Sequence, residues 1–281
     1  PFLLVFTTLS AWLTKAGVDR TTIGFFSWIG ITYSIKFFWA PVVDRLPLPL
    51  LTRLLGKRRS WMLAAQICIA LGLSGMALTD PGANLTQLAL FALLVAFGSA
   101  TQDITIDAWR IEAVERNLQG AMAASYVLGY RLALLSAGAG ALHLANLSSW
   151  TVTYLAMAGA MLVGVFTTLS IREPARTQES SYLHTSRDYF RFVLLFAGFV
   201  AAIILAYLSL SDVVTATKSW LVQAGAIEEL ASFVAEAFRL FAALLAALFA
   251  GWLLVRIHLA DRRMLRDTYI DPVADFFRRY G

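Results

Sequence analysis

Seven stretches of this chain are apolar over about 20 residues or more, and they constrain its fold more than any other feature. A helix needs about 20 mostly apolar residues to cross a bilayer, because each residue adds about 1.5 Å of rise. Strands of a membrane barrel need only about 9 to 11 residues each. The pattern therefore predicts an all-α, polytopic bundle of transmembrane helices, with spans near residues 22–43, 60–79, 85–109, 119–145, 150–171, 189–211 and 232–257.

The composition also indicates an integral membrane protein surrounded by lipid. Hydrophobic residues make up 59% of the chain, charged residues make up 15%, and the mean hydropathy is +0.68. Soluble domains contain about 45–50% apolar and about 25% charged residues. The net charge of +5 does not indicate a nucleic-acid partner, because the basic residues form short clusters between apolar stretches, as in membrane proteins.

Sequence motifs of soluble enzymes are missing from the chain. It contains no GxGxxG, P-loop, HExxH or GxSxG motif. Cys68 is the single cysteine, so neither an internal disulfide nor a thiolate metal site can form. The three histidines, His143, His184 and His258, lack metal-ligand spacing. We therefore expect no catalytic site, no metal site and no bound cofactor.

Clusters of basic residues occur in every second connection between the apolar stretches and predict the orientation. The connections near Asp80 and Asn146 contain no Lys or Arg. Lys and Arg concentrate in cytoplasmic loops, so we expect both ends of the chain to lie in the cytoplasm. The cytoplasmic clusters are expected to include Arg45, Arg53, Lys57, Arg58, Arg59, Arg110, Arg116, Arg172, Arg176, Arg187, Arg191, Arg256, Arg262, Arg263, Arg266, Arg278 and Arg279.

Two charges inside apolar stretches stand out, Lys36 in residues 22–43 and Asp103 in residues 85–109. A charge deep in a spanning helix costs about 2.5–3.5 kcal/mol on insertion scales and usually marks an ion or substrate pathway. Both residues lie about 10–12 Å from the cytoplasmic ends of their helices. We predict that they pair across neighbouring helices on a transport pathway; a static ion pair that joins two helices is the alternative.

Arg131 is the third intramembrane charge. Its helix begins near Gln119, which places Arg131 about 18 Å into the membrane, near the midplane where transporters bind substrates. A guanidinium can hold a carboxylate through two parallel hydrogen bonds. For Tyr126 and Tyr130, at i and i+4, ordinary helix packing is the favoured alternative. The candidate substrate-binding residues are Arg131, Lys36, Tyr33, Gln102, Tyr126 and Tyr130.

Charges of both signs gather at the cytoplasmic ends of the helices. Asp103, Asp107 and Arg110 share one helix face at i, i+4 and i+7. Such a cluster suits a gate that is closed in one conformation and open in another. For Arg110 and Glu112, a solvated charge run at the membrane edge is an equal alternative. The candidate gate residues are Asp44, Arg58, Arg59, Arg110 and Glu112.

Four segments together resemble a known family. They are residues 24–44 (GFFSWIGITYSIKFFWAPVVD), 56–61 (GKRRSW), 99–112 (SATQDITIDAWRIE) and 129–132 (GYRL). They resemble the AmpG-type muropeptide permeases of the major facilitator superfamily, and the match covers most of residues 1–172. The resemblance implies a symporter of the bacterial inner membrane that imports anhydro-muropeptides, which are anionic glycopeptides, for murein recycling and, in some bacteria, β-lactamase induction. The proton gradient would supply the energy, with Asp103 and Asp107 as the proton-coupling candidates.

The resemblance also predicts the domain organisation. The superfamily has two six-helix halves, and this chain resembles only the first. Asp44 and the basic cluster after it resemble a lengthened form of the superfamily's cytoplasmic loop signature, in which residues 46–55 interrupt the usual short spacing. We expect a six-helix half at 1–172 with a truncated first helix at 1–13 that lacks a starting Met, a cytoplasmic linker at 173–188, an extra helix pair at 189–257, and a linker at 258–281 that leads towards a missing C-terminal half-bundle.

Two alternatives stay open for the function. Arg131 and Lys36 suit phosphates as well as carboxylates, so another anionic cargo, such as an acetyl-CoA-type substrate, is the second interpretation. A non-transporting membrane scaffold is the third. Arg131 argues against a scaffold, because a scaffold gains nothing from a charge near the midplane.

Overall fold

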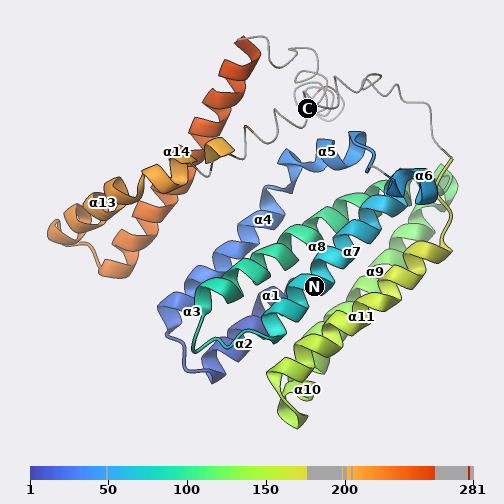
Figure 1. The fold of residues 1–281 in the computed structure, drawn as a ribbon, viewed down its shortest axis with the longest axis horizontal. Helices are drawn as coiled ribbons and strands as arrows, with labels where there is room; N and C mark the ends of the chain where they lie inside the picture. The colour runs from blue at the N-terminus through green and yellow to red at the C-terminus, as the bar shows by residue number, and fades with distance from the viewer. Residues whose placement is uncertain (49, 176–197, 199–200, 204, 257–277, 279–281) are drawn as a thin grey trace. The chain divides into compact units, whose positions relative to one another are not determined.

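The computed structural model describes residues 1–48, 50–175, 198, 201–203, 205–256 and 278, and the chain forms two compact units, Pro1–Glu179 and Ser180–Gly281. Within the described residues, every regular element is a helix (Figure 1). Five of the described helices are long and apolar enough to cross a membrane, or six if one bent pair counts as a single span. The predicted all-α, polytopic fold is confirmed.

The first unit contains four long helical segments and one broken one. Its elements are α1 (Phe2–Val5), α2 (Thr7–Lys15), α3 (Arg20–Phe26), η1 (Ser27–Gly30), α4 (Ile31–Ser34), η2 (Lys36–Phe38), α5 (Ala40–Arg45), α6 (Leu51–Leu55), α7 (Lys57–Ala77), α8 (Leu85–Ala113), η3 (Arg116–Leu118), α9 (Gln119–Leu135), η4 (Ser136–Gly140), α10 (Ala141–Leu147) and α11 (Trp150–Ser170).

The helices α7 and α8 run antiparallel through the centre of the first unit (Figure 1). Glycines allow them to approach closely. A Cβ atom on Gly72 would lie 2.6 Å from a methyl carbon of Val95, and one on Gly75 would lie 2.5 Å from the ring of Phe91. Small residues serve this purpose between membrane helices, because lipid offers no hydrophobic driving force and close packing must supply the contact energy.

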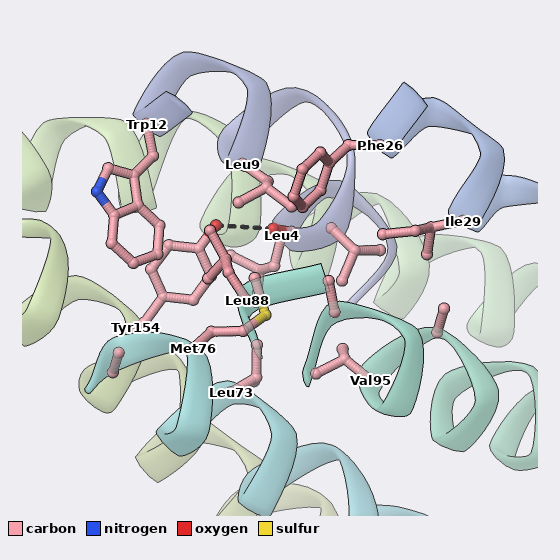
Figure 2. Close-up of a cluster of buried hydrophobic side chains, with 14 of the residues drawn as sticks. Leu4, Leu9, Trp12, Phe26, Ile29, Leu73, Met76, Leu88, Val95 and Tyr154 are labelled. Atoms are coloured by element: carbon pink, nitrogen blue, oxygen red, sulfur yellow. Dashed lines mark hydrogen bonds between the residues drawn. The ribbon is translucent and has the colours of Figure 1, made fainter. Parts of the chain in front are cut away.

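A cluster of buried side chains joins this helix pair to the N-terminal helices and to α11 (Figure 2). Tyr154 of α11 is fully buried in the cluster, and its hydroxyl donates a 2.8 Å hydrogen bond to the carbonyl oxygen of Leu4. The ring of Tyr154 lies 4.9 Å from that of Trp12. A buried tyrosine needs a partner for its hydroxyl, and here the partner lies beside the break between α1 and α2.

The stretch at 22–43 is broken, so the prediction of one continuous spanning helix there is wrong. Asp19 begins the segment by accepting a hydrogen bond from the Thr22 amide, and hydrogen bonds from Thr22 lower the pKa of the Asp19 carboxyl. The helix then passes through two 3-10 turns before α5. Pro41 is the second residue of α5 and has no N–H to donate to the preceding turn, so an unbroken α-helix cannot run through it.

The α9 segment is continuous with η4 and α10, and together they form one candidate span, Arg116–Leu147. A π-turn at Ser136–Gly140 interrupts it. None of the α9 side chains is buried. One long face of the first unit is therefore open along α9.

The second unit contains a bent helix and a long straight one. Helix Ala201–Ser209 meets α13 (Ser211–Gln223) at an angle of 47°, and α14 (Glu228–Arg256) follows. The span predicted at 189–211 lies largely outside the described residues, and its described part continues through the bend to Gln223. The span predicted at 232–257 begins earlier, at Glu228. The predicted linkers at 173–188 and 258–281 also lie largely outside the described residues.

A charged cluster holds the bend of the second unit. Arg239 of α14 donates a 2.6 Å hydrogen bond to the carbonyl oxygen of Tyr207, and its guanidinium lies 3.7 Å from the centre of the Tyr207 ring. Glu236 accepts a hydrogen bond from the Tyr207 hydroxyl at 3.2 Å and pairs with Arg239 at 3.4 Å. Arg239 thus supplies a hydrogen-bond donor to the Tyr207 carbonyl oxygen beside the bend, where the regular backbone hydrogen bonds of the helix are interrupted.

Candidate functional site

Lys36 and Asp103 lie together, as their matched depths predict. The Lys36 Nζ is 3.9 Å from the Asp103 Oδ2, and the two side chains are 36% and 39% exposed within the described structure. Lys36 lies in η2, within the broken segment that runs from α3 to α5. Its ammonium lies opposite Asp103 of α8. At 3.9 Å the pair is a loose ionic contact rather than a short hydrogen bond.

Two buried polar atoms beside this pair have no hydrogen-bond partner among the described residues. They are the hydroxyl of Tyr33, one turn before Lys36, and the Oε1 of Gln102, next to Asp103. Ser99 of α8 lies close enough to the Tyr33 hydroxyl to be a hydrogen-bond partner, so Gln102 Oε1 is the clearer unsatisfied atom of the two. An unsatisfied buried polar group costs about 1–3 kcal/mol, so these atoms mark a place where a ligand or water supplies the missing partner.

The tyrosines of α9 face the same charges. Tyr130 lies within electrostatic range of Tyr33, and Tyr126 lies within electrostatic range of both Asp103 and Asp107. Tyr130 is 46% exposed. Tyr33, Lys36 and Tyr126 therefore lie around Asp103, and Gln102 adjoins it in sequence. Tyr130 lies near Tyr33 and Tyr126.

Arg131 is set apart from that group. Its side chain is exposed on α9 and makes no hydrogen bond or ion pair with the described residues. It follows Tyr130 by one residue, which turns it to a neighbouring face of the helix. Within the described residues, Arg131 therefore does not contact the other candidate site residues.

Arg110 contacts Asp107, with which it was predicted to share a face of α8. Its guanidinium pairs with Asp107 at 3.2 Å and lies 4.8 Å from the centre of the Tyr126 ring. The predicted cluster at the helix ends contained Asp44, Arg58, Asp107 and Arg110. In the structure it forms two sets of contacts, one between Arg110, Asp107 and Tyr126 of α9, and one between Arg58, Asp44 and Glu112.

Arg58 joins the other gate candidates. It contacts the Asp44 carboxylate at 2.6 Å and the Glu112 carboxylate at 2.5 Å, with a second bond of 3.2 Å to Glu112, and its side chain is only 9% exposed. Lys57 donates to the Asp44 carbonyl oxygen. These contacts tie α5, α7 and α8 together, and they form even though residues 46–55 lengthen the connection between Asp44 and Arg58.

Arg59 and Glu173 form a reciprocal pair of helix caps between α7 and α11. The Glu173 carboxylate accepts hydrogen bonds from the backbone N–H groups of Arg58 at 2.8 Å and Arg59 at 3.1 Å. The Arg59 side chain donates to the carbonyl oxygens of Thr168 at 2.8 Å and Leu169 at 2.7 Å. A carboxylate thus lies at the positive end of α7, and a cation lies at the negative end of α11. The Arg59 side chain therefore donates to backbone carbonyl oxygens and not to the carboxylates of the predicted gate.

Glu173 was not predicted from the sequence as a functional residue, because it caps α7, which is far from Glu173 along the chain. The residue before α7 is Gly56, which has no side chain to cap the helix, and three basic residues follow it. Cations at the positive end of a helix dipole are unfavourable without a nearby anion. The three basic residues were therefore the sequence signal that an acidic residue lies near the start of α7. Gly56 has φ +88°, and a Cβ atom there would lie 2.4 Å from the Glu173 Cδ.

The geometry offers no metal site. Among the described residues, no group of three His, Cys, Asp or Glu side chains is placed to hold a metal ion. The site consists instead of one ammonium, two acidic side chains, an arginine and several hydroxyl and amide groups. Such groups can bind an anion and exchange protons.

Comparison with known proteins shows the family to which the chain belongs. The family model described as Major Facilitator Superfamily matches residues 2–266. The chain belongs to this superfamily. It is thereby placed among transporters rather than enzymes, and no solved structure matches it.

Several curated relatives of the superfamily are similar to this chain. The anhydromuropeptide permease of Escherichia coli (strain K12) is 39% identical over 197 residues, which are 68% of this chain and 39% of the relative. Putative transporter AmpG 4 of Rickettsia conorii is 28% identical over 274 residues, 92% of this chain and 65% of the relative. Putative transporter AmpG 4 of Rickettsia felis is 34% identical over 181 residues, 64% and 44% of the two chains. The chain thus spans less than two thirds of these relatives.

We predict that Lys36 and Asp103 are energetically coupled. Lys36→Met or Asp103→Asn leaves the other charge unpaired, and each change should destabilise the full-length protein by about 1–3 kcal/mol, because partial exposure lowers the cost of a fully buried pair. The double variant should lose clearly less than the sum of the two. Thermal unfolding of the purified protein in detergent measures this.

Asp107→Asn provides the matched control for this cycle, because Asp107 lies on the same face of α8 and pairs with Arg110 instead. Lys36→Met and Asp107→Asn should be additive. If Lys36→Met and Asp103→Asn are also additive, the observed contact contributes no coupling.

We predict that Gly56 is required by both its backbone and its neighbour. In Gly56→Ala the new Cβ meets Glu173 and the positive φ is strained, so the protein should lose about 2–4 kcal/mol of stability. In a Glu173→Ala background the collision is absent, and the added loss should fall to about 1 kcal/mol. Thermal unfolding of the four variants gives both values.

Gly120→Ala is the control substitution. Gly120 lies in α9 with no atom within 4 Å of a built Cβ, so alanine there should be neutral or stabilising by up to about 1 kcal/mol. An equal loss for Gly56→Ala with and without Glu173 would show that the close approach of Glu173 is unimportant.

Proposed function

We propose that this chain is the N-terminal half, with an inserted helix pair, of a proton-coupled transporter that imports anhydro-muropeptides across the bacterial inner membrane. One observation carries the proposal. In a chain 39% identical over 197 residues to a relative named anhydromuropeptide permease, Lys36 lies against Asp103, next to Gln102, whose Oε1 has no partner among the described residues. The transporter would serve murein recycling and, in some bacteria, β-lactamase induction.

The chemistry of the site suits an anionic glycopeptide. The Lys36 ammonium can pair with a carboxylate of the cargo, and the buried Tyr33 hydroxyl and Gln102 carbonyl oxygen lack partners that sugar hydroxyls and peptide N–H groups can provide. Tyr130 is exposed and can stack against a sugar ring. In this proposal, binding of the cargo satisfies polar atoms that the unit leaves unsatisfied.

Asp103 is the better proton carrier of the two candidates. Arg110 already holds Asp107 at 3.2 Å, whereas Asp103 has only the looser 3.9 Å contact with Lys36. A cargo carboxylate that binds Lys36 removes the partner of Asp103, and an unpaired carboxylate in a low-dielectric site favours its protonated form. Cargo binding and proton uptake are then linked through Lys36.

The open face of α9 supports the proposed second half-bundle. Arg131 lies on this helix without a partner among the described residues, and in the proposal a C-terminal half completes the pathway against it. Arg131 then contacts a second anionic group of the cargo. In the proposal both ends of the chain lie on the cytoplasmic side, which the basic clusters favour.

We predict that transport depends on Asp103. Proteoliposomes with the full-length protein should accumulate labelled anhydro-muropeptide when the outside is acidified. Asp103→Asn should abolish this accumulation but retain exchange of labelled for unlabelled cargo at equal pH, because exchange requires no net proton transfer. Uptake and counterflow of the same cargo measure both properties.

Asp80→Asn, in the turn between α7 and α8, is the control and should behave as wild type. Loss of exchange together with accumulation in Asp103→Asn would show that Asp103 binds cargo or maintains the fold rather than carrying the proton. Failure of the wild type to take up anhydro-muropeptide would contradict the proposed function itself, and uptake of an acetyl-CoA-type compound instead would favour the second interpretation.

We also predict that Arg131 binds an anionic group of the cargo. Arg131→Lys keeps the charge but loses the planar fork, so it should weaken apparent affinity, and Arg131→Gln should nearly abolish uptake of a folded protein. Loss of one charge-assisted hydrogen bond is worth about 1.5–3 kcal/mol, or about tenfold to a hundredfold in affinity.

An analogue of the cargo with the contacted carboxylate amidated tests the specificity of this contact. It should bind wild type poorly and lose little more in Arg131→Gln. If Arg131→Gln weakens binding of the acid and the amide equally, Arg131 is structural and does not contact the cargo.

A further inference from the structure

A leucine-rich segment between α5 and α7 has no part in the site described above. It comprises residues 46–48 and 50–55 and includes the short helix α6. Leu50 is 76% exposed and Leu54 is 81% exposed, although both are large apolar side chains. Leu50 lies directly before α6, and Leu54 lies within it.

Both ends of the segment are held at one end of α7. The Trp61 indole N–H donates a 2.8 Å hydrogen bond to the carbonyl oxygen of Leu46, and Arg58 contacts Asp44 just before the segment. The other end continues through Gly56 directly into α7, which is a candidate membrane span. Residues this close to the end of a span lie in the interfacial layer of the bilayer.

The backbone and the charge of the segment fit the same location. Leu50 has φ +66°, a conformation that is unfavourable for a bulky side chain and persists only where the surroundings compensate. In water, the exposed side chain of Leu50 would gain nothing in return. Arg53 is exposed beside the two leucines, and an arginine at this depth is suited to anionic phospholipid headgroups.

We propose that Leu50 and Leu54 insert into the acyl region of the adjoining leaflet, with Arg53 at the anionic headgroups, so that this segment anchors the start of α7 to the membrane. The anchor lies next to the contacts of Arg58 with Asp44 and Glu112, and it holds that end of α7 at a set depth. The proposal depends on the membrane location of α7 and not on the identity of the cargo. In the orientation proposed above, the leaflet is the inner one.

Spin labels distinguish lipid, protein and water as the surroundings of these side chains. Single cysteines replace Leu50 or Leu54 in the full-length protein carrying Cys68→Ala, and each is labelled with a nitroxide in liposomes. Apolar oxygen concentrates in the acyl region, whereas a nickel chelate stays in water. The ratio of the two accessibilities should be severalfold higher at positions 50 and 54 than at Ala83, in the exposed turn before α8.

Leu46, which is 5% exposed, provides the reference for a protein-covered position. Low accessibility to both reagents at positions 50 and 54, as at Leu46, would show that another part of the protein or a second chain covers the leucines. High accessibility to the nickel chelate would show that they face water. Either result overturns the proposal.

The headgroup contact is tested by lipid composition. Adding phosphatidylglycerol to phosphatidylcholine liposomes should increase the ratio at position 54 further, and Arg53→Gln should remove that increase while leaving the ratio in phosphatidylcholine unchanged. An equal response with and without Arg53 would overturn the assignment of Arg53 to anionic headgroups.

Discussion

The packing of one end of the first unit depends on the ion pairs of the Arg58 guanidinium. This guanidinium is nearly buried and lies between the Asp44 and Glu112 carboxylates, so removing either partner leaves a buried charge underpaired. Its backbone N–H is capped by Glu173, which ties α11 to the same point. Four helical segments, α5, α7, α8 and α11, therefore converge on one residue at the start of a candidate span.

This cluster and the proposed transport site are built on the same helix. Asp103 and Glu112 lie on α8, about 14 Å apart along its axis, with Asp107 and Arg110 between them. A rigid helix transmits a shift or rotation from one end to the other. The helix α8 therefore joins the contact of Lys36 with Asp103 to the contact of Arg58 with Glu112, and a movement of α8 changes both.

Much of the architecture follows from local features of the sequence. The spans at α7, α8 and α11 were predicted because apolar length alone decides whether a helix can cross a bilayer. The pairing of Lys36 with Asp103 was predicted from the similar distance of each residue from the cytoplasmic end of its helix. The sequence did not reveal the breaks in the segment that contains Lys36, nor the distant residue Glu173 that caps α7.

The sequence by itself determined the all-α membrane fold and the family, and it predicted the contact between Lys36 and Asp103. Tertiary structure decided the other contacts: Arg110 contacts Asp107 and Tyr126, Arg59 caps α11, and Arg131 makes no contact with the other site residues among those described. Helix periodicity specifies the height and direction of a side chain on its own helix. The choice of partner depends also on how neighbouring helices are rotated and spaced, and packing between distant parts of the chain sets those quantities.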